Sequence, residues 1–314
     1  MASVYVTRDL PGDALDRLRS EHHVEVWQSR LPPPARELRE HAASCEALLT
    51  LLTDRVDADL IAAGGRLRGI ANYAVGVDNV DVEAATARGV PVGNTPDVLT
   101  ETTADLTLAL MLAAARRLIE GHEVVRGGDW LTWEPAALLG HDLNGSTVGI
   151  VGYGRIGRAV ARRLEGFGAQ VIQTSRSGGV ALEELLGRSD FVTLHCPLTP
   201  DTEGLIDEAA LRAMKETAYL VNTARGPIVE TQALARALGE GWIAGAALDV
   251  TDPEPLPSRH PLLDAPNLLV LPHVGSATHR TRQAMADMAV DNLRAALAGE
   301  RMPHCVNPEV YEDR

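Results

Sequence analysis

Short apolar runs alternate with amphipathic segments along the whole chain, and this alternation restricts the fold more than any other feature. Near the N-terminus there are five such runs: Val4–Val6, Val24–Val26, Ala47–Leu52, Gly69–Ala74 and Pro91–Val92. Six more follow later in the chain: Thr147–Val151, Val171–Ile172, Phe191–Leu194, Tyr219–Thr223, Ala246–Val250 and Leu268–Leu271. Strands that alternate with helices form parallel sheets with helices on both faces. The sequence therefore predicts an α/β protein built from two Rossmann-like, doubly wound domains.

Two long helical stretches flank the second series of runs. One extends from Asp97 to about Leu118 and the other from about His279 to Leu297, each with apolar residues near helical spacing. A chain of 314 residues has the usual size of about two domains. We therefore predict a discontinuous, flavodoxin-like substrate domain of residues 1–98 plus 283–314. Residues 99–282 are predicted to form a dinucleotide-binding Rossmann domain.

Composition and charge argue against several function classes. The formal charge of −14 offers no basic surface for a phosphate backbone, so we expect no nucleic-acid partner. No apolar stretch approaches the ~18 residues of a membrane span, and the N-terminus shows no signal-peptide pattern. The cysteines, Cys45, Cys196 and Cys305, lack metal-type spacing, and their odd number suits a reducing compartment. We expect a cytoplasmic protein with free thiols, no membrane partner and no bound metal.

A glycine-rich turn follows the first run of the second series. Gly152-Tyr153-Gly154-Arg155-Ile156-Gly157 comes directly after an apolar run, and apolar residues then repeat as in a helix packed on a sheet. Alone this pattern is weak, because glycines also serve ordinary turns. In its strand, turn and helix context it predicts a dinucleotide site. The pyrophosphate is expected at the helix N-terminus, close to Gly154, which has no side chain.

The end of the next strand distinguishes the two nicotinamide dinucleotides. An NAD site carries an acidic residue there, which accepts a bond from the ribose 2′-hydroxyl. This chain instead has Ser175-Arg176-Ser177, with no acid before Glu183. A guanidinium binds phosphate, and the serine hydroxyls add hydrogen bonds. We therefore predict NADPH as the preferred cofactor, with NADH as the alternative; the competing interpretation makes Arg176 a solvated surface residue.

Three consecutive runs of the second series are followed by polar residues suited to one reaction. Parallel strands present ligands at their carboxyl ends, so Arg225, Glu254 and His273 are expected at one edge of the sheet. Arg225 can hold a carboxylate with two parallel bonds. His273 can exchange a proton near neutral pH, and Glu254, between two prolines, can orient its ring and favour the imidazolium. This set predicts hydride transfer to or from a 2-oxo or 2-hydroxy acid.

Each of these three residues also has an ordinary interpretation, as a surface arginine, a solvated acid and a buried histidine. Their combination favours the catalytic one. We further expect Asp249, at its strand end, to bond the nicotinamide carboxamide. The amides of Val75 and Gly76 lie at a strand-to-turn corner and are expected to meet the substrate carboxylate opposite Arg225, unless the corner is a plain turn.

These motifs resemble those of the D-isomer-specific 2-hydroxyacid dehydrogenases, most closely the glyoxylate/hydroxypyruvate reductase branch. The resemblance covers nearly the whole chain, and its most specific segments are Asn94–Thr100, Val148–Gly157, Val221–Gly226, Leu248–Pro255 and Pro272–Thr278. It implies reduction of glyoxylate or hydroxypyruvate to glycolate or D-glycerate. The nicotinamide would supply the hydride and His273 the proton.

The resemblance also implies roles for individual residues. Arg225, Glu254 and His273 take the catalytic positions, and Val75, Gly76 and His273 contact the substrate. Cofactor contacts are implied at Thr103, Gly154, Arg155, Ile156, Arg176, Thr223, Asp249 and Gly275. Our predicted cofactor site further includes Gly152, Gly157, Ser175, Ser177, Cys196, Pro197, Ala224, His273 and Ser276, and the predicted substrate pocket includes Leu52, Trp133 and Arg225.

The branch is typically homodimeric, and a tryptophan of one subunit reaches the substrate pocket of the other. Trp133 matches that position; ordinary packing within a dimer is the alternative. One departure concerns the cofactor site. Only Ser177 to Val180 separate Arg176 from the helix expected at Leu182, whereas relatives usually carry a longer, helix-containing segment. The adenosine side of the site is therefore expected to be shortened.

Other functions share this architecture. Formate and phosphite dehydrogenases are relatives, but formate enzymes of this type usually have glutamine where Glu254 stands. Other D-2-hydroxyacid dehydrogenases and small 3-phosphoglycerate dehydrogenases remain open. In a different class, the C-terminal binding protein corepressors use the fold as a nucleotide-sensing module and keep similar catalytic residues. Turnover of a 2-oxo acid distinguishes an enzyme from such a module.

Overall fold

The computed structural model describes residues 1–312, and the chain divides into two compact units. Unit 1 contains Met1–Leu99 and Ala277–Arg314, and unit 2 contains Thr100–Ser276; Asp313 and Arg314 lie outside the described residues. We expected the chain to pass from one unit to the other between residues 98 and 99 and to return between residues 282 and 283. In the structure the return lies earlier, between residues 276 and 277. The reason is that Thr278 caps helix α11 (His279–Ala298), whose whole length then belongs with unit 1.

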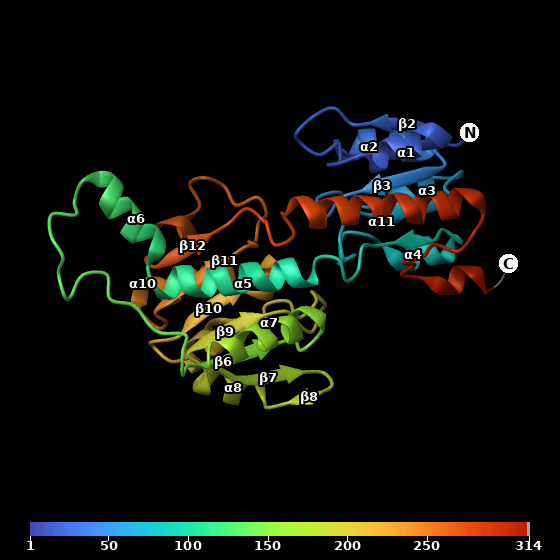
Figure 1. Ribbon diagram of the computed structural model, residues 1–314. Helices are drawn as coiled ribbons and strands as arrows, with labels where there is room; N and C mark the ends of the chain where they lie inside the picture. The colour runs from blue at the N-terminus through green and yellow to red at the C-terminus, as the bar shows by residue number, and fades with distance from the viewer. Residues whose placement is uncertain (313–314) are drawn as a thin grey trace. The chain divides into compact units, whose positions relative to one another are not determined.

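Unit 1 is a five-stranded parallel sheet with helices on both faces (Figure 1). The strand order β2-β1-β3-β4-β5 is that of flavodoxin-like folds. Besides α11, its elements are β1 (Ser3–Val6), α1 (Ala14–Glu21), β2 (His23–Val26), α2 (Ala35–Ser44), β3 (Ala47–Thr50), α3 (Ala58–Ala63), β4 (Gly69–Asn72), α4 (Val82–Ala87), β5 (Val92–Gly93) and a 3-10 turn (Pro308–Tyr311).

The alternation of side chains along β1 explains the two faces of this sheet. Val4 and Val6 point to a core that also contains residues of α1 and α11, whereas Tyr5 points to a core built with α2 and α3. Successive side chains of a strand alternate between faces, so a fully apolar strand requires helices on both sides. The continuous apolar runs in the sequence reflect this double burial.

Unit 2 is a seven-stranded sheet preceded by two helices. Its elements are α5 (Thr100–Ala115), α6 (Leu118–Gly127), β6 (Thr147–Val151), α7 (Arg155–Gly166), β7 (Gln170–Ser175), β8 (Gly178–Gly179), α8 (Leu182–Arg188), β9 (Phe191–Leu194), α9 (Glu208–Ala213), β10 (Tyr219–Asn222), α10 (Thr231–Glu240), β11 (Gly245–Leu248), β12 (Leu268–Val270) and 3-10 turns at Gly226–Ile228 and Pro261–Asp264. Helices α5 and α7 pack on one face and α8, α9 and α10 on the other.

The strand order of unit 2 is β12-β11-β10-β9-β6-β7-β8, and all pairs are parallel except β7 with β8. The two-residue strand β8 folds back on β7 as a hairpin. It occupies the edge where the common dinucleotide-binding order, 3-2-1-4-5-6, has a further parallel strand. The expected shortening after Arg176 thus takes the form of this hairpin.

The predicted fold class is confirmed: the chain forms two parallel, doubly wound α/β units. Every apolar run singled out in the sequence lies wholly or partly in a strand, and each of the two long helical stretches contains a helix, α5 or α11. Within residues 1–312, no helix combines the length and the hydropathy needed to cross a bilayer.

Candidate active site

The three predicted catalytic residues follow neighbouring strands of unit 2. Strands β10, β11 and β12 lie side by side and run parallel, so their carboxyl ends share one edge of the sheet. Arg225 follows β10, Glu254 follows β11 and His273 follows β12. The loops also touch: a Cβ atom placed on Gly226 would lie 1.9 Å from the carbonyl oxygen of Thr251. Glycine at this position therefore lets the arginine loop pack on the glutamate loop.

His273 and Glu254 form a direct pair. The Nδ1 atom of His273 lies 2.5 Å from Oε1 of Glu254, and the two side chains are 23% and 31% exposed. With Nδ1 engaged by the carboxylate, Nε2 is the ring nitrogen left to exchange a proton. This arrangement suits a proton donor whose orientation and tautomer are fixed.

The backbone of His273 is held in an unusual conformation by Asp249. His273 has φ 55°, a left-handed value that costs a residue with a side chain about 1–3 kcal/mol. Its N–H donates to the carbonyl of Asp249 at 2.8 Å. The next two N–H groups, of Val274 and Gly275, each donate to one carboxylate oxygen of Asp249 at 2.7 Å. Three bonds to one residue thus fix the loop that presents the imidazole.

Asp249 was predicted to bond the nicotinamide carboxamide, and the hydrogen bonds that its carboxylate accepts come from this loop. The residue is 1% exposed, and burial raises its pKa, although the N–H groups of Val274 and Gly275 oppose that change. Each carboxylate oxygen retains a second lone pair. The loop bonds are nevertheless sufficient to explain why an acid occupies this buried strand end.

Arg225 is half-buried, and its guanidinium donates from Nη1 to the carbonyl of Ala224 at 2.8 Å. Thr223, two residues before Arg225, contacts helix α5, because its hydroxyl lies 3.1 Å from that of Thr107. In the first turn of the same helix, the Thr103 hydroxyl donates to the carbonyl of Gly275 at 3.3 Å. Helix α5 therefore holds both the arginine loop and the histidine loop. Sequence reasoning missed Thr107, whose only signal was a polar residue in an apolar helix.

The glycine-rich turn fits a dinucleotide. Gly152 has φ 97°, and a Cβ there would lie 2.4 Å from the backbone nitrogen of Cys196. A Cβ on Gly157 would lie 2.3 Å from the carbonyl oxygen of Gly152, so helix and strand approach closely. Around Gly154, the N-cap of α7, a Cβ would meet no atom within 4 Å. The space beside Gly154 thus leaves room for a pyrophosphate at this helix end.

The remaining predicted cofactor residues lie along the same edge of unit 2. Arg155 is exposed and Ile156 half-buried in the first turn of α7, whereas Cys196 is half-buried and Pro197 exposed after β9. Ser276, the last residue of unit 2, and Ala224 are half-buried.

The β7–β8 hairpin contains the residues predicted to contact the 2′ substituent of the cofactor ribose. The Ser175 hydroxyl donates to the carbonyl of Gly178 at 3.0 Å and lies 3.0 Å from the Ser177 hydroxyl. Arg176, at the tip, is exposed. The serines therefore shape the turn, and the arginine side chain extends from it.

His195 is a feature of this edge that sequence reasoning did not single out. It follows β9, its N–H donates to the carbonyl of Val151 at 2.7 Å, and its Nε2 lies 3.0 Å from the Thr193 hydroxyl. Its Nδ1 is buried without a hydrogen-bond partner. Burial lowers the pKa of His195 to about 3, so the ring stays neutral at physiological pH. The signal in the sequence was its place directly before Cys196 and Pro197.

Three predicted substrate residues lie elsewhere in the chain. Val75 and Gly76 follow β4 in unit 1, where their carbonyls accept bonds from Asn94 and Asn72 at 2.8 and 3.0 Å. These bonds fix the orientation of the corner. Leu52, after β3, is 36% exposed. The structure therefore assigns these residues to unit 1 and the catalytic three to unit 2. Trp133, the fourth pocket residue, is 78% exposed in unit 2.

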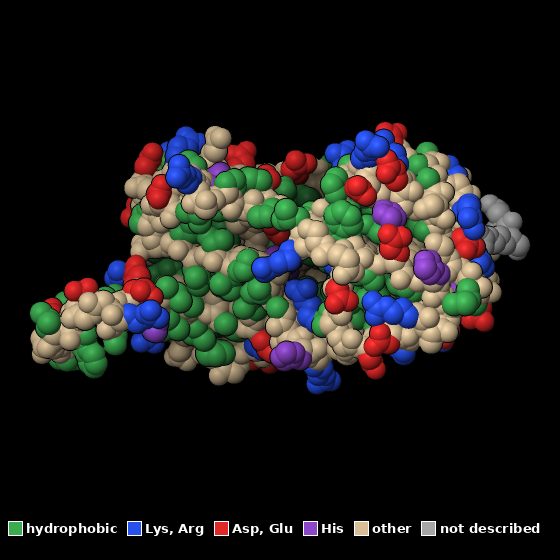
Figure 2. Space-filling view, turned by 90° about the horizontal axis from the view of Figure 1, so that it is seen from above, with side chains coloured by type: hydrophobic (Ala, Val, Ile, Leu, Met, Phe, Trp, Pro, Cys, Tyr) green, Lys and Arg blue, Asp and Glu red, His purple; other side chains and the backbone are tan. Residues whose placement is uncertain are grey.

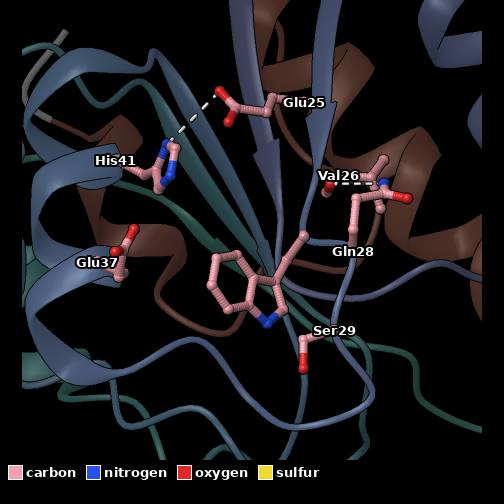
Figure 3. Close-up of a pocket in the computed structure, with 7 residues that line it drawn as sticks. Glu25, Val26, Gln28, Ser29, Glu37 and His41 are labelled. Carbon is pink, nitrogen blue, oxygen red and sulfur yellow. Dashed lines mark hydrogen bonds and ion pairs between the residues drawn. The ribbon is translucent and has the colours of Figure 1, made fainter.

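A separate pocket of about 580 Å³ in unit 1 contains none of the predicted site residues. Figure 3 shows Glu37 and His41 of α2 on one side and Glu25 of β2 on another, with His41 Nδ1 3.6 Å from Glu25. Among residues 1–312, no group of three or more His, Cys, Asp or Glu side chains is arranged to hold a metal ion. The strand ends of unit 2 are thus the better candidate site.

Comparison with known proteins decides the family. The profile of the D-isomer specific 2-hydroxyacid dehydrogenase, NAD binding domain, matches residues 108–275. A glyoxylate reductase of Korarchaeum cryptofilum is 48% identical over 323 residues, which cover 99% of this chain and 97% of that protein. The chain belongs to the D-isomer specific 2-hydroxyacid dehydrogenase family. The resemblance inferred from the motifs is therefore confirmed.

Solved structures agree with this assignment. A protein from Thermus thermophilus is 50% identical with a TM-score of 0.93, and the match covers 97% of this chain and 99% of that one. An NADPH-dependent glyoxylate/hydroxypyruvate reductase from Sinorhizobium meliloti, solved in complex with NADP and malonate, is 34% identical with a TM-score of 0.87. That match covers 98% of each chain. The similarity thus extends across both units.

We expect His195 to make the fold sensitive to acid. Below its ordinary pKa of 6.5 the unfolded chain takes up a proton at this ring, whereas the folded chain does so only near pH 3. The stability contributed by the neutral ring is therefore present above pH 6.5 and lost as the pH falls toward 3. In the parent, the unfolding free energy should fall as the pH is lowered below 6.5. In His195→Gln, this fall should be smaller by about 1 kcal/mol per pH unit. Urea unfolding at pH 6, 5 and 4 measures this slope, with the exposed-residue variant His23→Gln as the control. Equal slopes for His195→Gln and the parent would show that the ring is protonated in the folded state.

Proposed function

We propose that this protein reduces a short 2-oxo acid, glyoxylate or hydroxypyruvate, to the 2-hydroxy acid with a nicotinamide cofactor. The observation that carries the proposal is the pairing of His273 with Glu254 at the strand edge that also bears Arg225. The glycine turn that fits a dinucleotide follows β6 of the same parallel sheet. The glyoxylate reductase of Korarchaeum cryptofilum, alike over nearly its full length, supports the same substrate class.

The proposed mechanism assigns one task to each residue. Arg225 holds the substrate carboxylate with parallel, charge-assisted bonds, and so fixes the orientation of the neighbouring carbonyl. With a reduced nicotinamide dinucleotide held at the glycine turn of residues 152–157, the hydride for the carbonyl carbon would come from the cofactor. His273 then gives the Nε2 proton to the oxygen on which negative charge develops. Glu254 keeps the ring oriented through Nδ1. No step requires a metal ion.

We also propose that NADPH is preferred over NADH. The support is the absence of an acid at the end of β7, together with the exposed guanidinium of Arg176 on a hairpin shaped by Ser175 and Ser177. The Sinorhizobium meliloti relative is NADPH-dependent by name. A 2′-phosphate would form charge-assisted bonds with the guanidinium that a 2′-hydroxyl cannot match.

The third part of the proposal is a homodimer formed through the arm, by which we mean residues 118–140. Helix α6 buries none of its own residues, and the arm exposes seven large apolar side chains: Leu118, Ile119, Val125, Trp130, Leu131, Trp133 and Leu139. Figure 2 shows hydrophobic side chains along this segment, which projects at the left. An exposed apolar surface of this kind favours a protein partner. We propose a second copy as that partner, with Trp133 entering its substrate pocket.

Turnover tests the proposed reaction. The purified protein should oxidise NADPH in the presence of glyoxylate or hydroxypyruvate. The reaction is measured by the loss of the absorbance of the reduced nicotinamide. In Glu254→Gln, kcat should fall about tenfold, because a neutral amide holds Nδ1 of His273 less strongly than the carboxylate does. The exposed acid Glu216 precedes β10, at the end of the strand away from the site, and Glu216→Gln should keep the parental kcat.

Two results would contradict this proposal. Cofactor binding without turnover on a panel of 2-oxo acids would favour a nucleotide-sensing module. An unchanged kcat in Glu254→Gln would show that the carboxylate does not support the proton donor.

The cofactor preference is tested at the hairpin tip. Arg176→Ala should raise the KM for NADPH about tenfold, as expected for the loss of a charge-assisted bond, and leave the KM for NADH nearly unchanged. Steady-state kinetics with both cofactors at saturating glyoxylate measure the ratio. Arg188→Ala, which removes an exposed arginine of α8, is the control. A parent enzyme that favours NADH would refute the assignment of Arg176.

Substitution of two tryptophans in the arm tests whether Trp133 enters the substrate pocket of the second copy or only packs within the dimer. Trp133→Ala should lower kcat/KM for hydroxypyruvate about tenfold while the protein stays dimeric, because a large aromatic contact to substrate is lost. Trp130→Ala should leave kcat/KM close to the parent value. Light scattering after gel filtration gives the oligomeric state. If both variants keep parental kinetics, the tryptophans serve packing only, and a monomeric parent would remove the proposed dimer.

A further inference from the structure

Asn222 is a fully buried polar residue at the end of β10, three positions before Arg225. It belongs to none of the predicted contact sets. A buried side-chain amide is costly unless its donor and acceptor are both satisfied. In Asn222 both are used, and both partners lie in the loop that carries Arg225.

The side chain of Asn222 bridges two peptide groups of this loop. Its Oδ1 accepts from the N–H of Ala224 at 3.0 Å, and its Nδ2 donates to the carbonyl of Arg225 at 2.8 Å. Only one orientation of the amide satisfies both, because a backbone N–H must donate and a carbonyl must accept. The backbone of Asn222 is fixed as well, since its carbonyl accepts from the N–H of Asp249 at 2.9 Å.

The peptide group that joins Ala224 to Arg225 lies between the two that Asn222 bridges, and it accepts a hydrogen bond from the guanidinium. It contains the carbonyl of Ala224, to which Nη1 of Arg225 donates at 2.8 Å. Because Asn222 fixes the peptide groups on either side, the direction of this carbonyl follows from the Asn222 side chain. The carbonyl in turn sets where one arm of the guanidinium lies.

We propose that Asn222 is a positioning residue that sets the Arg225 guanidinium for the substrate carboxylate. This inference rests on the proposed function, in which Arg225 is the carboxylate anchor. Asn222 acts through Arg225 and touches neither substrate nor cofactor. It follows that its loss weakens substrate binding, while the dinucleotide site at the start of α7 is left unchanged.

The chemistry of the bridge requires an amide. Aspartate has the same shape and would still accept from Ala224, but its second oxygen would face the carbonyl of Arg225. Serine is too short to span both peptide groups. Leaving one buried partner unsatisfied weakens the bridge, and the tenfold loss of affinity expected from this corresponds to about 1.4 kcal/mol.

A double-mutant cycle with Arg225→Ala tests the proposal. In the parent background, Asn222→Ser and Asn222→Asp should raise the KM for glyoxylate about tenfold or more, with a smaller change in kcat. The NADPH dissociation constant, measured by quenching of intrinsic fluorescence, should stay within about twofold. In the Arg225→Ala background, the same substitutions should lower kcat/KM by less than about twofold, because the group they position is gone.

The control variant is Asn144→Ala. Asn144 also donates from Nδ2 to a backbone carbonyl, that of Phe167 at 2.9 Å, but it precedes β6 at the other end of the strand. It should keep the parental KM. Equal losses in both Arg225 backgrounds, or an NADPH affinity that falls in step with substrate binding, would overturn the positioning role. So would Asn222 variants with an unchanged KM.

The outcomes also separate this inference from the proposed function. A parent that turns over no 2-oxo acid removes both. An active parent with additive effects in the cycle removes only the role of Asn222. Thermal unfolding with bound NADPH identifies a variant that fails to fold; if Asn222→Ser does so, the isosteric Asn222→Asp supplies the cycle, and loss of folding in both marks Asn222 as structural and overturns the proposal.

Discussion

The carboxylate of Asp249 is the interaction on which the rest of the candidate site depends. It accepts the N–H groups of Val274 and Gly275 and so holds His273 at a left-handed φ. Without these bonds the strained loop would relax, and the imidazole would lose its register with Glu254. An acid is kept in this buried place although burial raises its pKa, because two backbone donors need one rigid, two-oxygen acceptor.

A parallel arrangement exists one strand away. Asn222 at the end of β10 bridges two peptide groups of the arginine loop, as Asp249 at the end of β11 bridges two N–H groups of the histidine loop. The backbones of the two residues are joined by a hydrogen bond of 2.9 Å. Buried polar side chains at strand ends thus convert a regular sheet edge into two loops of fixed shape. The chemistry proposed for Arg225 and His273 relies on this support.

Much of the fold could be predicted because doubly wound sheets require a distinctive pattern of residues. Strands such as Ala47–Thr50, buried on both faces, appear as uninterrupted apolar runs, and the glycines at 152 and 157 mark close approaches that tolerate no Cβ. The second boundary between units lies at 276/277, where the prediction had 282/283, and a cap such as Thr278 is a single residue whose hydrogen bond becomes visible only in the structure. Thr107 was missed for a similar reason, because its partner, Thr223, is recognisable only once helix α5 packs on the sheet. His195 was missed because its burial, rather than its local partner Thr193, sets its pKa, and burial depends on tertiary packing.

The sequence by itself determined which residue types follow each strand, and hence the chemistry available: a guanidinium, a carboxylate, an imidazole and a glycine turn. Parallel topology then dictated that the strand ends share one edge. Only the tertiary structure decided which atoms pair there, that Nδ1 of His273 meets Glu254 and that Asp249 serves the backbone. Hydrogen bonds depend on distances of a few tenths of an ångström between segments far apart in the chain, and local propensity carries no information on that scale.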